Sequence, residues 1–81
     1  MPERADLVER LAEHVGVPPL TEPEIDSVLA LAGAAAHGTG DRTNAPLVSF
    51  LAGVAAAESG DRLASLSDLR RRTAELAPPV D

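Results

Sequence analysis

Apolar residues recur at helical spacing in four segments of the chain, which the sequence places at residues 3–15, 22–37, 45–58 and 66–77. In each segment they return every three or four residues, and this is the period that brings side chains onto one face of an α-helix. We therefore predict an all-α fold, a compact bundle of four helices forming a single domain over residues 1–77. Residues 78–81, which begin with a Pro-Pro pair, are predicted to be a disordered tail.

Capping and helix-breaking residues mark the boundaries of these segments. Thr21 and Glu24 fit a capping box, in which each side chain accepts a hydrogen bond from the other residue's backbone N–H. Gly16 is predicted to end the first helix, and Gly38 is predicted to end the second in the left-handed conformation. Asn44 is the predicted N-cap of the third helix, and Ser65 opens a capping-box-like start for the fourth.

The third segment is apolar around most of its circumference, and such a helix is typical of the centre of a fold. We expect it to be the central helix of the bundle. Gly33 and Gly53 both lie inside helices, where each glycine costs about 1 kcal/mol relative to alanine. A close approach of the second and third helices would explain both glycines.

The chain must build its core almost without aromatic side chains. Among its 81 residues Phe50 is the only aromatic, and Trp, Tyr and Cys are absent. A chain of this length has a thin stability margin, so we expect very close helix packing or a partner that covers apolar surface. A homodimer is one such arrangement. Without cysteine there is no disulfide framework, thiolate nucleophile or Cys-based zinc site.

The formal net charge of −6 disfavours contact with a phosphate backbone, so we expect no nucleic-acid partner. No apolar run reaches the roughly 20 residues that a membrane helix needs, and the charged N-terminus lacks the apolar core of a signal peptide. These observations predict no membrane association and a cytoplasmic location.

His37, Arg42 and Asn44 are the candidate interaction or ligand residues, because they gather around the loop between the second and third helices. Free N–H groups at the start of the third helix and the positive charge of Arg42 would favour an anion there. The structural alternative is that His37 interacts with the dipole at a helix C-terminus and caps carbonyl groups. The sequence leaves both interpretations open.

Other local patterns favour structural roles. The acids at 22, 24 and 26 fail as a calcium loop, because Ser27 stands where the turn glycine belongs. The three consecutive arginines at 70–72 would point in different directions on a helix, so we predict that they are solvated and do not form a binding patch. Ser27 follows an aspartate, as in acyl carrier proteins, but it falls inside a helix. No nucleophile with a base and no metal set is evident, so we expect no enzyme activity, cofactor or metal.

Residues 35–38 (Ala-Ala-His-Gly) and 45–55 (Ala-Pro-Leu-Val-Ser-Phe-Leu-Ala-Gly-Val-Ala) resemble a small uncharacterised all-helical family of high-G+C bacteria. Its members occur alone or associated with molybdenum-cofactor guanylyltransferase-like proteins. Thr39 and the pair Thr43-Asn44 depart from the family pattern. The positions that match it are His37, Gly38, Arg42, Pro46, Leu47, Phe50 and Gly53.

The resemblance implies an accessory role in molybdenum-cofactor biosynthesis. We therefore predict a non-catalytic protein-interaction domain with a larger partner, which the resemblance suggests is a molybdenum-cofactor guanylyltransferase. The alternative is a small-molecule or anion-binding module that uses the loop between the second and third helices. An acyl-carrier-like protein is the third hypothesis.

Overall fold

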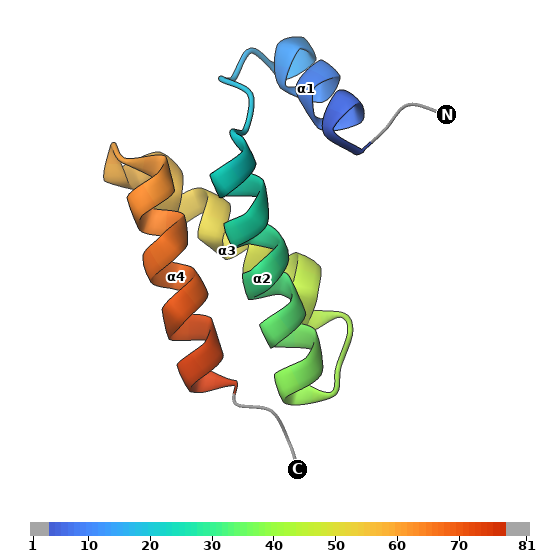
Figure 1. The fold of residues 1–81 in the computed structure, drawn as a ribbon, viewed down its shortest axis with the longest axis vertical. Helices are drawn as coiled ribbons and strands as arrows, with labels where there is room; N and C mark the ends of the chain where they lie inside the picture. The colour runs from blue at the N-terminus through green and yellow to red at the C-terminus, as the bar shows by residue number, and fades with distance from the viewer. Residues whose placement is uncertain (1–3, 78–81) are drawn as a thin grey trace.

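The computed structural model describes residues 4–77 and contains four helices. They are α1 (Arg4–Val15), α2 (Glu22–Thr39), α3 (Asn44–Ser59) and α4 (Arg62–Leu76) (Figure 1). No strand occurs within residues 4–77, so the predicted all-α class and its four helices are confirmed. The predicted disordered tail at 78–81 lies outside the described residues.

The start of α2 is capped as the sequence predicts. The side-chain oxygen of Thr21 accepts a hydrogen bond from the backbone N–H of Glu24 at 3.3 Å. The Glu24 carboxylate in turn accepts one from the backbone N–H of Thr21 at 2.7 Å. This reciprocal pair satisfies two donors that would otherwise lack a partner near the start of the helix.

The other end of α2 differs from its prediction. The helix continues through Gly38 to Thr39, and the left-handed residue is Gly40, with a φ of 73°. Gly38 lacks a side chain for another reason, since a Cβ there would collide with the backbone of Ala77 and lie 2.6 Å from its carbonyl carbon. Gly38 therefore allows the ends of α2 and α4 to approach each other.

Two helix starts also differ from their predictions. α3 begins at Asn44 itself, with Thr43 in the cap position, so Asn44 is not the N-cap. α4 begins at Arg62, earlier than the predicted residue 66. The cause is the side chain of Asp61, which accepts a hydrogen bond from the backbone N–H of Ala64 at 3.1 Å and caps the helix there.

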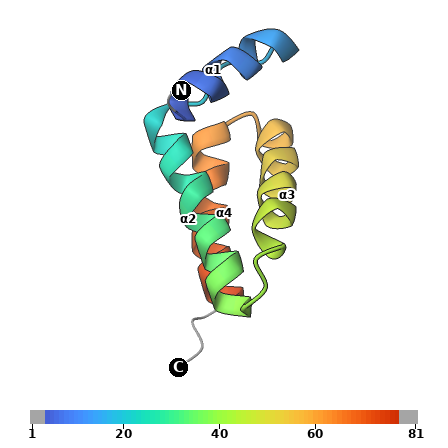
Figure 2. The same cartoon turned by 90° about the vertical axis from the view of Figure 1, so that its right-hand side faces the viewer.

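Helices α2, α3 and α4 form a bundle in which α2 and α4 run in the same direction and α3 runs in the opposite one (Figures 1 and 2). α2 packs against both neighbours and contributes five of the buried residues, whereas α3 contributes two and α4 one. The central helix is therefore α2, and the prediction that the third helix is central is wrong.

Small side chains explain this result. The core cluster consists of Leu31, which is fully buried, together with Ala52, Ala56 and Leu66. α3 enters the core mainly through two alanines, with Val48 packed against the cluster, while its leucines and Phe50 lie elsewhere and Phe50 is 74% exposed. A helix that is apolar all round can occupy an edge of the bundle when its small residues face inward.

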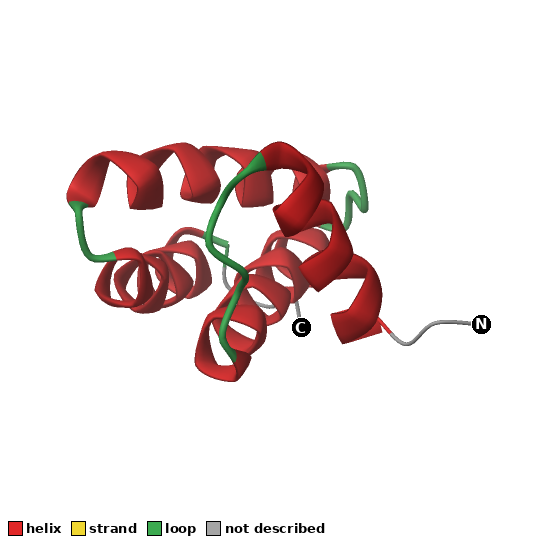
Figure 3. Ribbon diagram, turned by 90° about the horizontal axis from the view of Figure 1, so that it is seen from above, coloured by secondary structure: helices red, strands yellow, loops and turns green. Residues whose placement is uncertain are grey.

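α1 lies across one end of the bundle rather than beside its helices (Figures 2 and 3). No Cα atom of α1 comes within 8 Å of a Cα atom in α2, α3 or α4. α1 ends just before Gly16, as predicted, and Gly16 adopts the left-handed conformation with a φ of 76°. The segment from Val17 to Leu20 then carries the chain to α2.

The expected close approach at the two mid-helix glycines is also wrong. A Cβ added at Gly53 would meet no atom within 4 Å, and one added at Gly33 would meet only a side-chain carbon of His37, at 4.0 Å. Neither glycine is therefore required by helix packing, in contrast to Gly38.

Alanine substitutions at Gly38 and Gly53 should change stability in opposite directions. Gly53→Ala should raise the free energy of unfolding by about 0.5–1 kcal/mol, because alanine favours a helix and space is available. Gly38→Ala should lower it by about 1–3 kcal/mol, since the new methyl group overlaps the Ala77 backbone. Urea unfolding of the two variants measures both changes, and a shift of the same sign would contradict the packing described.

Candidate interaction site

One partly buried ion pair joins three segments of the chain. The Glu24 side chain is 5% exposed and binds the Arg62 guanidinium through two hydrogen bonds, from Nε to Oε2 and from Nη2 to Oε1, the latter at 2.8 Å. Arg62 also donates to the carbonyl oxygens of Pro18 at 3.0 Å and Pro19 at 2.8 Å. We call these contacts the Arg62 clamp, and they hold the linker against the starts of α2 and α4.

The clamp lowers the pKa of Glu24 to about 2, from an ordinary value of 4.5. The main cause is the hydrogen bond from Arg62, and the Thr21 N–H adds to it, while burial acts in the opposite direction. Strongly shifted carboxylates often mark functional sites. Here, however, the carboxylate already accepts three hydrogen bonds from within the chain, so its arrangement is that of a structural ion pair.

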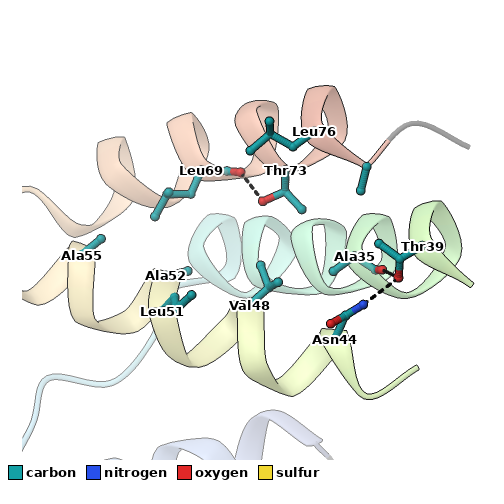
Figure 4. Close-up of a pocket in the computed structure, with 11 residues that line it drawn as sticks. Ala35, Thr39, Asn44, Val48, Leu51, Ala52, Ala55, Leu69, Thr73 and Leu76 are labelled. Carbon is teal, nitrogen blue, oxygen red and sulfur yellow. Dashed lines mark hydrogen bonds between the residues drawn. The ribbon is translucent and has the colours of Figure 1, made fainter. Parts of the chain in front are cut away.

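An apolar groove of about 520 Å³ lies between α3 and α4, and α2 forms its floor (Figure 4). Figure 4 shows side chains from α3 and α4 facing each other across it. We call it the α3–α4 groove. Its apolar lining consists mainly of Val48, Leu51 and Ala55 from α3, Leu69 and Leu76 from α4, and Ala35 from α2.

Polar side chains on this groove are bonded within the chain. The Thr39 hydroxyl donates to the carbonyl oxygen of Ala35 at 2.5 Å, and the Thr73 hydroxyl donates to that of Leu69 at 2.7 Å. Asn44 Nδ2 donates to Thr39 Oγ1 at 2.9 Å (Figure 4). Both hydroxyl hydrogens are therefore already used, and the surface offered by the groove is mainly apolar.

Of the three candidate residues, the structure brings only Asn44 to the groove. His37 and Arg42 are exposed to solvent, and neither lines the groove. The loop between them is ordered by Asp41, whose carboxylate accepts hydrogen bonds from the hydroxyl and backbone N–H of Thr43 at 2.6 and 2.9 Å. These bonds lower the pKa of Asp41.

The proposed anion site and carrier site meet structural obstacles. The backbone N–H of Ala45, which an anion would need, donates to the carbonyl oxygen of Arg42 at 3.2 Å. Ser27 is only 4% exposed, so its hydroxyl is not accessible for attachment of a carrier group. Within residues 4–77, no three His, Cys, Asp or Glu side chains gather as ligands for a metal ion. No helix in this range has the length and apolar character needed to cross a membrane.

The fold and groove define a small all-helical domain with an apolar surface between two helices. The chain belongs to the family described as domain of unknown function (DUF6457), whose model matches residues 2–80. The expected membership of an uncharacterised helical family is thereby confirmed. No curated protein and no solved structure gives a significant match.

The low pKa of Glu24 predicts a specific loss of stability in acid. The folded carboxylate stays ionised below the pKa of the unfolded chain, so the clamp contributes fully above about pH 5 and is lost as the pH falls toward 2. The contribution lost is on the order of 3 kcal/mol. Glu24→Gln should be less stable at pH 7 and should show a flatter dependence on pH between these limits.

Unfolding free energies of the parent and of Glu24→Gln, measured from pH 7 to pH 2, test this prediction. Asp68→Asn is the matched control, because Asp68 also pairs with arginines but is exposed. Equal pH dependence in the parent and Glu24→Gln would show that the clamp does not stabilise the folded state.

Proposed function

We propose that this chain is a non-catalytic protein-interaction domain whose α3–α4 groove binds an apolar segment of a larger partner protein. The observation that carries the proposal is that the groove is largely apolar while its threonine hydroxyls already donate within the chain. A polar substrate would find few free donors there. An apolar side chain of the partner, by contrast, would be shielded from water by α3 on one side and α4 on the other.

Two exposed leucines in the groove would contribute to such an interaction. Leu51 is 67% exposed and Leu76 is 86% exposed, and they stand on its two walls. Fully burying one leucine side chain contributes about 1.5–3 kcal/mol. Two helices with a third as floor also form the kind of groove that accepts the apolar face of an amphipathic helix.

The resemblance stated above suggests the partner to test first. Members of the similar family are associated with molybdenum-cofactor guanylyltransferase-like proteins, so a protein of that class is the proposed partner. The chain would then act as an accessory domain in molybdenum-cofactor biosynthesis. The absence of charged side chains among the groove-lining residues is consistent with recognition through apolar contacts.

A small apolar molecule is the second candidate occupant. The groove volume of about 520 Å³ lies within the range of known ligand pockets, roughly 300–1,000 Å³. Thr39 and Asn44 place the loop between α2 and α3 at one end of the groove, so this candidate uses part of the predicted loop site.

Substitution of Leu76 by glutamate should weaken partner binding without unfolding the chain. Leu76 is highly exposed, so the charge is tolerated in the free protein but would be buried in the complex. Leu29→Glu is the matched control, because Leu29 is 45% exposed on α2 and does not line the groove. We expect Leu76→Glu to weaken binding to the guanylyltransferase-like protein at least about tenfold, and Leu29→Glu to leave it unchanged.

Calorimetric titration of the purified proteins measures these affinities, with circular dichroism to verify folding. Equal binding by both variants would exclude the groove as the docking site. Absence of binding by the parent chain would reject this partner. A rise in melting temperature with small apolar compounds, lost in Leu76→Glu, would then favour the ligand candidate.

A further inference from the structure

Two apolar stripes of the described chain lie outside the α3–α4 groove, on different elements. The α1 stripe consists of Leu7, Leu11 and Val15, which are 61%, 60% and 63% exposed. The outer α3 face consists of Leu47, Phe50 and Val54, which are 62%, 74% and 43% exposed. Each stripe follows helical spacing, and neither lines the groove assigned to the larger partner.

Within one chain, the α1 stripe and the outer α3 face do not pack against each other. α1 makes no close backbone approach to α3, and the linker that would have to bend is a Pro-Pro segment. The Arg62 clamp binds the carbonyl oxygens of Pro18 and Pro19, which fixes the direction in which the chain leaves the bundle. The linker therefore holds α1 across one end of the bundle, where Leu11 and Val15 stay more than half exposed and no Cα atom of α1 lies within 8 Å of one in another helix (Figure 2).

The two stripes match each other in length. At a rise of about 1.5 Å per residue, the α1 stripe extends about 12 Å and the outer α3 face about 10 Å. Their six side chains expose on the order of 600 Å² of apolar surface per chain. This is most of the roughly 800 Å² that each partner buries in a stable dimer.

Charge also favours contact through these stripes. Two copies with a net charge of −6 repel each other, but the outer α3 face lies in a stretch, residues 44–57, that carries no charged residue. The acids of α1 are on the opposite side of that helix from its apolar stripe, at Asp6, Glu9 and Glu13. The exposed Arg42, just before α3, has the opposite sign.

We propose that two copies of this chain associate by exchanging α1, so that the α1 stripe of each copy packs on the outer α3 face of the other. Each copy offers one donor and one acceptor surface. A two-fold symmetric dimer therefore covers both stripes and leaves neither open for further growth. The α3–α4 groove remains a separate surface, so this inference does not depend on the proposed function.

Sedimentation equilibrium of the full chain tests the exchange. The parent should be dimeric, while Leu11→Glu and Phe50→Glu should each weaken dimerisation at least about tenfold, because each buries an unpaired charge in the contact. Both side chains are exposed in the single chain, so each variant should remain folded with the parent's helicity after dimerisation is weakened. Leu29→Glu is the exposed control on α2 and should remain dimeric.

A mixture of the two variants separates exchange from simple pairing of two α3 helices. Leu11→Glu retains an intact outer α3 face, and Phe50→Glu retains an intact α1 stripe. The mixture alone can form one undisturbed α1–α3 contact, so it should dimerise more tightly than either variant. A parent that stays monomeric at about 100 μM, or a Leu11→Glu variant that dimerises as the parent does, would overturn the proposal.

Discussion

The Arg62 clamp is the interaction on which the arrangement of this chain depends. A single guanidinium binds the buried carboxylate of Glu24 and the carbonyl oxygens of Pro18 and Pro19, so it joins the linker to the starts of two helices. Glu24 simultaneously completes the cap of α2. Because one residue pair serves both purposes, the start of α2, the start of α4 and the direction of α1 are set together.

The alanines in the core also determine where the exposed apolar surface lies. Ala52 and Ala56 bring α3 into contact with the core, but the leucines and Phe50 of α3 lie on other faces. Some of those side chains form one wall of the α3–α4 groove, and others form the outer α3 face. The limited burial inside one chain and the apolar surface outside it thus have the same origin. This is the physical basis for our proposal that the protein recognises other chains.

The features of this structure that depend on neighbouring residues could be predicted from the sequence. The features that depend on contacts between distant segments could not. The helical periods, the capping box at Thr21 and the end of α1 at Gly16 each depend on residues close in the chain. The partner of Glu24 lies 38 residues away, so its capping role was visible while its ion pair was not. The groove also arises only when α3 and α4 come together. His37, Arg42 and Asn44 were therefore predicted to form one site because they are close in sequence, although only Asn44 lines the groove.

A double-mutant cycle between Glu24 and Arg62 tests the central role of the clamp most directly. The free energies of unfolding of Glu24→Gln, Arg62→Met and the double variant yield the coupling energy of the pair. The account predicts a coupling of about 2 kcal/mol or more, since the pair is bidentate and its carboxylate is buried. The same cycle for the exposed pair Asp68 and Arg72 should give a clearly smaller value. A Glu24–Arg62 coupling no larger than that of the exposed pair would contradict the account.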